Sequence, residues 1–106
     1  MADERPRQFE IDLPPEVIPG HYADFANVWH TPNVFVMDFV TLAQPPRDST
    51  DPETGAPQLV VPARVVSRIR IPPEQVFELA KALTQQLEFW EQETGRRSPV
   101  EPPLEE

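Results

Sequence analysis

Asp38 is the residue of this sequence whose surroundings most suggest a structural or chemical role. It stands within residues 34–40, Val-Phe-Val-Met-Asp-Phe-Val, where a buried carboxylate without a partner would be costly. We therefore expect an ion pair between Asp38 and an arginine of a neighbouring strand, Arg64 or Arg68, with charge-assisted hydrogen bonds. Catalytic use of Asp38 is the alternative, because catalytic sites and structural ion pairs both perturb carboxylates.

The other residue types that carry chemistry form no recognisable site. His21 and His30 are the only histidines, and there is no cysteine, so a transition metal would need carboxylate ligands, and no close-spaced ligand motif is present. Ser67 lacks the Gly-x-Ser-x-Gly turn of a serine hydrolase. Three glycines, at positions 20, 55 and 95, cannot build a phosphate-binding loop. We expect no catalytic residue, metal or cofactor, and hence a protein that is not an enzyme.

A candidate interaction surface consists of arginines on one face of a predicted strand and aromatic side chains on the neighbouring strands. Its members are Arg64, Arg68, Arg70, Trp29, Phe35 and Phe39. Arginines and aromatic rings on one sheet face are typical of surfaces that bind single-stranded nucleic acid. The alternative is a face whose arginines pair with acidic side chains. The net charge of −9 favours this alternative, because phosphate binding normally requires a basic surface.

Four segments have the pattern of strands, and they must position these residues. Residues 8–13, Gln-Phe-Glu-Ile-Asp-Leu, alternate strictly between polar and apolar side chains. Residues 21–30 and 34–42 form a predicted β-hairpin, and residues 63–71 alternate again. Residues 43–62 contain five prolines and little periodic signal, so we expect a mobile loop without regular structure there.

Both faces of the predicted hairpin are largely apolar. If Pro32-Asn33 is a two-residue turn, alternate residues of the two strands share a face. One face then carries Phe25, Asn27, Trp29, Val36, Asp38 and Val40, and the other carries Val28, His30, Phe35, Met37 and Phe39. A sheet that is apolar on both sides needs two covering layers.

One helix follows the last predicted strand. Pro72-Pro73-Glu74 suits its first turn and Gly95 its end. Apolar residues recur at intervals of four and three in a stripe that consists of Val76, Ala80, Leu83, Leu87 and Trp90. We expect an α+β fold, in which a four-stranded antiparallel sheet (β-β-β-β-α) carries one C-terminal amphipathic helix on one face. The single domain spans residues 8–94, between disordered tails at 1–7 and 95–106.

The size of this domain favours self-association. A core built from so few ordered residues supplies only a few kcal/mol, and one helix covers only one of the two apolar sheet faces. We expect a homodimer that acts as a protein-interaction or regulatory module, with a second copy and an unidentified protein as partners. The N-terminus lacks the apolar stretch of a signal peptide, and no segment reaches the roughly 20 apolar residues that span a bilayer. We therefore expect a cytoplasmic protein without a membrane partner.

Three stretches of the sequence resemble a prokaryotic family of unknown function, DUF3467. They are Leu-Pro-Pro-Glu at 13–16 with Gly-His-Tyr-Ala-Asp-Phe at 20–25, residues 30–39, and residues 63–69 with their Val-Ser-Arg run. The resemblance covers residues 9–94 and implies a small bacterial protein without established activity or functional residues to carry over. The layout of four antiparallel strands and a C-terminal helix is also similar to that of the export chaperone SecB, which would imply binding of unfolded or apolar segments.

Overall fold

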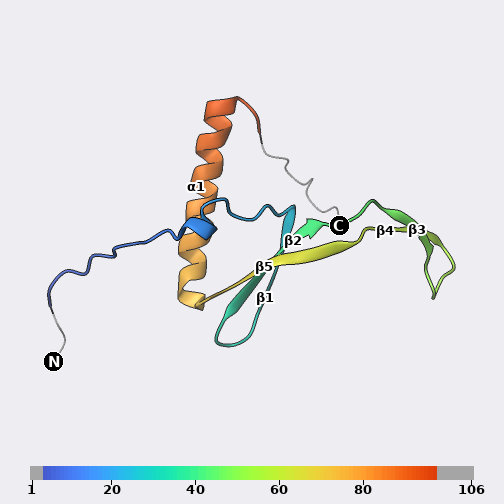
Figure 1. Ribbon diagram of the computed structural model, residues 1–106, viewed down its shortest axis with the longest axis horizontal. Helices are drawn as coiled ribbons and strands as arrows, with labels where there is room; N and C mark the ends of the chain where they lie inside the picture. The colour runs from blue at the N-terminus through green and yellow to red at the C-terminus, as the bar shows by residue number, and fades with distance from the viewer. Residues whose placement is uncertain (1–3, 98–106) are drawn as a thin grey trace, which may run out of the picture.

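The computed structural model describes residues 4–97 and has an α+β fold (Figure 1). Its elements are η1 (Pro15–Val17), β1 (Phe25–His30), β2 (Phe35–Leu42), β3 (Arg47–Thr50), β4 (Pro57–Val60), β5 (Ala63–Ile71), η2 (Pro73–Gln75) and α1 (Val76–Thr94). In the described residues, β1, β2 and β5 form an antiparallel sheet in the order β1-β2-β5, and β3 pairs with β4 in a second sheet. The prediction of one four-stranded sheet was therefore wrong in its strand count.

The β1–β2 hairpin has the predicted register. Thr31 N donates a hydrogen bond to Val34 O at 2.9 Å across the Pro32-Asn33 turn, and Trp29 lies opposite Val36. The predicted division of the hairpin into two faces is therefore confirmed. It follows because alternate residues of paired strands point to the same side of a sheet.

A β-bulge interrupts the pairing between β2 and β5. Phe39 lies opposite Ser67, whereas Val40 lies opposite Val65, so Val66 is the extra residue. Because of this shift, even-numbered side chains of β5 point to one sheet face after the bulge and to the other face before it. We call the side of Trp29, Val36, Asp38, Val40, Arg68 and Arg70 the open face, and the side of Val28, Phe35, Met37, Phe39, Ile69 and Ile71 the helix face.

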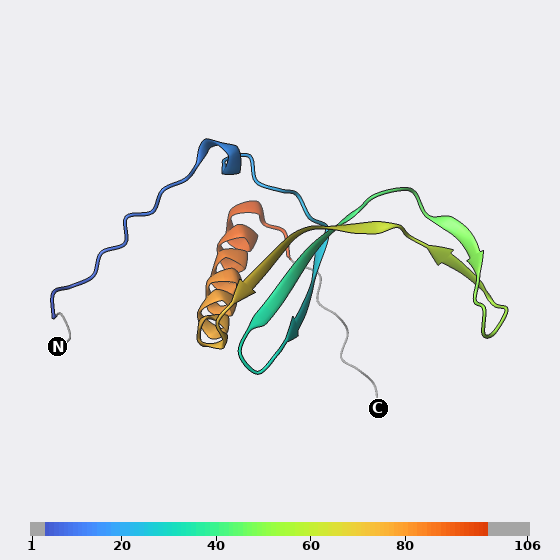
Figure 2. The ribbon, with the colours of Figure 1, turned by 60° about the horizontal axis from the view of Figure 1, so that its bottom comes forward.

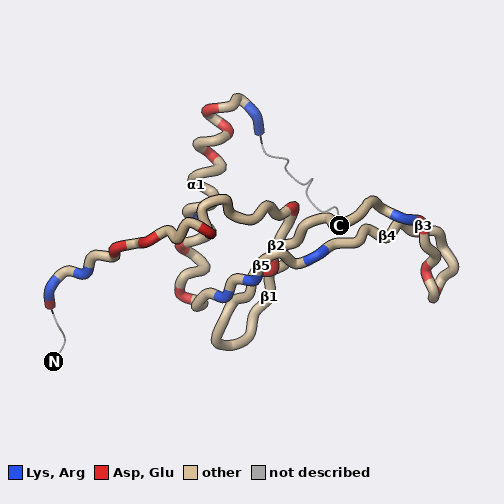
Figure 3. The backbone as a smooth tube through the Cα atoms, viewed as in Figure 1, with Lys and Arg blue, Asp and Glu red and all other residues tan. Residues whose placement is uncertain are grey.

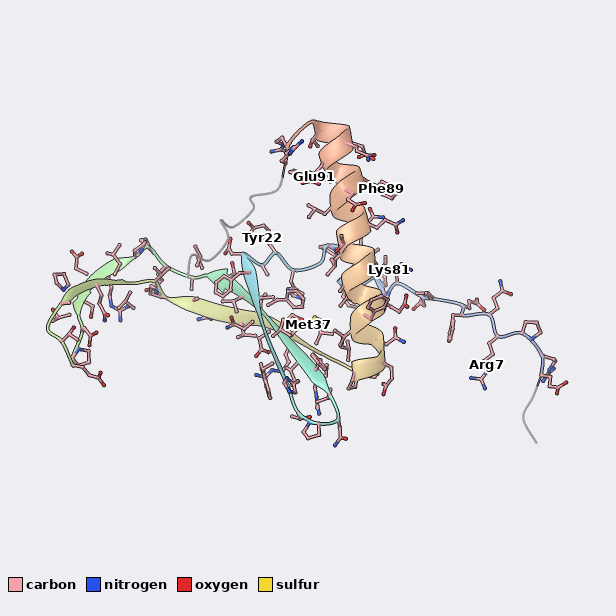
Figure 4. The ribbon with its side chains drawn as sticks, turned by 180° about the vertical axis from the view of Figure 1, so that it is seen from behind. Arg7, Tyr22, Met37, Lys81, Phe89 and Glu91 are labelled. Atoms are coloured by element: carbon pink, nitrogen blue, oxygen red, sulfur yellow. The ribbon has the colours of Figure 1, made fainter. Side chains whose placement is uncertain are left out.

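Helix α1 lies on the helix face, but only its first half contacts the sheet. Val76, Leu79, Ala80 and Leu83 line a cavity of about 160 Å³ together with Val28, Phe35, Met37 and Ile71. In Figure 4 the helix rises away from the sheet, with Met37 near its base and Phe89 far along it. None of the described side chains of α1 is buried. No helix in residues 4–97 is long and apolar enough to cross a membrane.

Both ends of α1 lie where the sequence pattern predicted them. The chain passes through Pro72 and Pro73 into the first turn, with Pro73 at an N-terminal position of η2. Gly95 has a φ of 71° and donates its N–H to Glu91 O at 2.9 Å. This left-handed conformation favours glycine, which lacks a Cβ atom.

Residues 8–13, which we call the N-terminal segment, are not a strand in this structure, contrary to our prediction. In the described chain the segment is extended and pairs with no strand. Phe9 is 85% exposed and Ile11 is 89% exposed. Figures 1 and 2 show α1 between the segment and its own sheet. The alternating pattern specifies a strand, but hydrogen bonding also requires a sheet edge alongside.

The predicted structureless loop at 43–62 contains the β3–β4 arm, the antiparallel pair Arg47–Thr50 and Pro57–Val60. Asp51 N donates to Ala56 O at 2.9 Å, and Asp51 Oδ1 accepts from Glu53 N at 2.8 Å. These turn hydrogen bonds close the arm, which projects from the end of the main sheet in Figure 1. Because β3 is polar and β4 is short and does not alternate, apolar alternation did not indicate these strands.

The predicted tails are described only in part. Residues 4–7 and 95–97 contain no helix or strand. The rest of the predicted tails, residues 1–3 and 98–106, lie outside the described residues.

Candidate functional site

Asp38 is the centre of a paired polar cluster on the open face, the Asp38 cluster, which consists of Trp29, Asp38 and Arg68. Arg68 Nε donates to Asp38 Oδ1 at 2.6 Å and Arg68 Nη2 donates to Asp38 Oδ2 at 3.0 Å. Trp29 Nε1 donates to Asp38 Oδ2 at 3.2 Å. The Arg68 guanidinium also lies over the Trp29 ring, 5.6 Å from its centroid. Of the two partners predicted for Asp38, Arg64 and Arg68, the structure pairs it with Arg68.

The sheet register places these three side chains together. Asp38 lies opposite Arg68 on one side and opposite Asn27 on the other, so Trp29 is its diagonal neighbour. Val36 and Val40 flank Asp38 on β2 and are 3% and 5% exposed, while Asp38 is 7% exposed. Buried valines on either side exclude water from the carboxylate, and the guanidinium and indole supply its hydrogen bonds.

The cluster keeps Asp38 ionised. The hydrogen bonds from Arg68 lower the pKa of Asp38 from its ordinary value, the Trp29 hydrogen bond lowers it further, and burial opposes both. The same pairing raises the pKa of Arg68. A lowered pKa makes this carboxylate a weaker proton acceptor near neutral pH, and its oxygens are already hydrogen-bonded, so the geometry favours a structural role for Asp38 over general acid–base chemistry.

The predicted interaction surface is divided between the two sheet faces, contrary to our prediction for the arginines. Arg68 and Arg70 lie on the open face, but Arg64 is opposite Thr41 and lies on the helix face. Phe35 and Phe39 are also on the helix face, whereas Trp29 is on the open face. The bulge at Val66 causes the division of the arginines. The alternation of side chains along β2 and β5, rather than the bulge, separates the phenylalanine rings from Arg68 and Arg70, the charges they would accompany in nucleic-acid stacking.

Neither histidine lies on the sheet face that carries Asp38, the carboxylate proposed for a metal or catalytic site. His30 stacks on Phe35 with ring centroids 5.3 Å apart, on the helix face. His21 lines a cavity with Phe39 and Ile69. Asp38 is on the opposite face of the sheet. Within residues 4–97, no three potential ligands gather in a group that could hold a metal ion.

Asp24 has a role that the sequence did not reveal. Its Oδ2 accepts hydrogen bonds from Leu42 N at 2.8 Å and from Thr41 Oγ1 at 3.1 Å. The Leu42 hydrogen bond is the main reason why the pKa of Asp24 is lowered. Asp24 thus ties the start of β1 to the end of β2. The hairpin register, which places residue 24 across from residue 41, was the signal that could have identified it.

Comparison with known proteins identifies a family but no activity. Residues 1–97 match the model of the family described as "Protein of unknown function (DUF3467)". No curated protein and no solved structure matches the chain. The family resemblance seen in the sequence is therefore confirmed. The likeness to SecB has no support, since the main sheet of the described residues has three strands.

Proposed function

Because the chain belongs to this DUF3467 family, whose description assigns no activity, we propose its function from its surfaces: it is a non-enzymatic protein-interaction module that acts as a homodimer. The observation that carries the proposal is the exposed apolar stripe on the second half of α1. Leu87 and Trp90, the two members of the stripe in this half, are 41% and 37% exposed. Apolar side chains gathered along one helix in this way are typical of interaction sites.

A second copy is the occupant that we propose for this stripe. On the described sheet, only Val36 and Val40 are buried apolar residues, so one chain has very little core. Domains of this size commonly gain the missing stability by association. The stripe provides the apolar area for a two-fold interface between helices. The paired, ionised state of Asp38 also agrees with a structural use of the sheet.

The β1 edge is the surface that we propose for another protein. Phe25–His30 lies at the edge of the sheet and includes no proline, lysine or acidic residue. Charges and prolines normally protect such edges, and an unprotected edge accepts an added strand. The Thr31–Val34 hydrogen bond at the turn implies that Val28 directs its backbone groups away from β2, because these groups alternate in direction along an antiparallel strand.

Size-exclusion chromatography with light scattering tests the homodimer. We expect the wild type to be a dimer at tens of micromolar, and a strict monomer would overturn the proposal. Leu87→Glu should shift the protein to monomer, because it places a charge in the stripe. Gln85→Glu adds the same charge to an exposed position of the same helix outside the stripe, and should remain a dimer. Equal behaviour of both variants would reject the stripe as the interface.

Affinity purification from the native host tests the β1 edge. The wild type and Val28→Pro serve as baits, since proline removes the outward N–H at this position and leaves the hydrogen bonds to β2 in place. A partner that binds by strand addition should be recovered with the wild type and lost with Val28→Pro, whose circular dichroism should remain that of a folded chain. Recovery of the same proteins with both baits would reject the edge as the binding surface.

A further inference from the structure

We infer that the homodimer exchanges its N-terminal segments: residues 8–13 of each copy add as a strand to the outer edge of β5 in the other copy. The inference rests on the proposed homodimer and specifies a second contact in it. It assigns a partner to two features that the single chain leaves without one. These are an alternating segment with no sheet beside it and a sheet edge with no strand beside it.

The N-terminal segment has the sequence of a strand and the exposure of an unpaired one. Its apolar side chains, Phe9, Ile11 and Leu13, are 85%, 89% and 59% exposed. No proline interrupts it before Pro14-Pro15. Figures 1, 2 and 4 all place α1 between this part of the chain and its own sheet, with Arg7 labelled on the far side in Figure 4. This position keeps the segment away from its own sheet and leaves it accessible to another copy.

The polar side of the segment complements the open face of β5. Glu10 and Asp12 alternate with the apolar residues, and Arg68 and Arg70 occupy alternate positions on β5. Figure 3 shows acidic residues along the N-terminal segment and basic residues along β5. A strand at this edge would place two acidic side chains beside two basic ones. Opposite charges on neighbouring strands stabilise the pairing.

The apolar side of the segment matches the other side of the same edge. When Glu10 and Asp12 lie on the open face, Phe9, Ile11 and Leu13 necessarily lie on the helix face, because the side chains of a strand alternate. There they would cover Ile69, which is 42% exposed, and lie beside Ile71. One register therefore satisfies both the charges and the apolar side chains.

The β1 edge fits this segment less well. Phe25–His30 contains no arginine or lysine to pair with Glu10 and Asp12. The β5 edge is unpaired within residues 4–97, where β5 bonds only to β2. The charges therefore select β5 for the second copy and leave β1 for other partners.

Ile11→Glu tests the apolar contact in the full-length chain. Because Ile11 is 89% exposed and its segment is unpaired in the single chain, the substitution should leave the fold of the monomer unchanged. The exchanged dimer contains the contact twice, so its dissociation constant should rise by about a hundredfold or more. Gln8→Glu introduces the same charge on the polar side of the segment and should change dimerisation far less.

A charge exchange between two chains tests whether the contact is intermolecular. Glu10→Arg and Arg70→Glu each place like charges together in their own homodimers, and each should weaken dimerisation by about tenfold. Mixing the two variants pairs every segment with an edge of opposite charge, so native mass spectrometry should detect mainly heterodimers. Arg68 is left unchanged because it holds Asp38. A contact within one chain would give no preference for heterodimers, and that result would overturn the exchange.

The outcomes separate this inference from the proposed function. A monomeric wild type would overturn both. A dimeric wild type whose dissociation constant is unaffected by Ile11→Glu would overturn the exchange alone and leave the α1 stripe as the interface. Hydrogen exchange gives an independent readout, since every second amide of residues 9–13 and the amides of Arg68 and Arg70 should be protected only in the dimer.

Discussion

Replacing Val40 by alanine should lower the free energy of unfolding by about 2 kcal/mol, because Val40 is one of the two most buried apolar side chains of the described residues. Val40 is 5% exposed. The substitution removes two carbon atoms, each worth about 0.8 kcal/mol when buried, and the remaining cavity adds to the loss. For a domain of this size the melting temperature should fall by about 8 to 16 °C.

Val28→Ala is the matched control. Val28 is also a strand residue of the same sheet but is 60% exposed, so the same chemical change should cost only about 0.6 kcal/mol. The change in strand propensity is shared by the two variants and largely cancels. Thermal and urea unfolding, followed by circular dichroism, measure the difference. Both variants must be compared at one protein concentration, because the stability of a dimer depends on it.

Equal losses at the two positions would refute the reasoning. That result would mean that the open face at Val40 is no better covered than the exposed edge strand. The side chains of β1 and β5 would then not bury the centre of β2. A loss at Val40 several times that at Val28 would instead support a small core on the open face, away from α1.

Three further predictions concern the Asp38 cluster and the end of α1. Since the folded-state pKa of Asp38 is lowered, the ionised carboxylate stabilises the fold above its ordinary pKa, and this stabilisation is lost as the pH falls through the folded-state pKa. Between pH 6 and about pH 2, the melting temperature should therefore fall less steeply for Asp38→Asn than for the wild type. Identical slopes would contradict the role of Arg68. Arg68→Lys cannot form the two-pronged pair, so the pKa of Asp38, measured by NMR titration, should move towards its ordinary value. Gly95→Ala should cost about 1 kcal/mol in thermal unfolding, because alanine resists the left-handed conformation at φ 71°.

Local signals predicted the hairpin, the helix and the ion pair. The two-residue turn fixed the register, which in turn placed Trp29 and Asp38 on one face. Prolines and Gly95 marked the ends of the helix. An arginine partner for Asp38 followed from the high cost of an unpaired buried carboxylate, a rule that holds for any fold, but the choice between Arg64 and Arg68 required the register of β5.

The predictions that failed depended on structure beyond the local pattern. The bulge at Val66 carries no glycine to announce it, and it moved Arg64 to the other face. The short strands of the β3–β4 arm are joined by turn hydrogen bonds, which apolar alternation does not reveal. The N-terminal segment has the alternation of a strand, but alternation does not specify which edge it meets.

The bulge also sets the direction of the β3–β4 arm. Strand β4 ends at Val60 and β5 begins at Ala63, so the chain runs from the arm into the main sheet and meets the bulge three residues later, at Val66. A bulge bends its strand and increases the local twist. Val66 therefore sets the angle between the β3–β4 arm and the main sheet, and its deletion would change the direction of the arm. The deletion would also turn either Arg64 or the Arg68–Arg70 pair to the opposite face of the sheet.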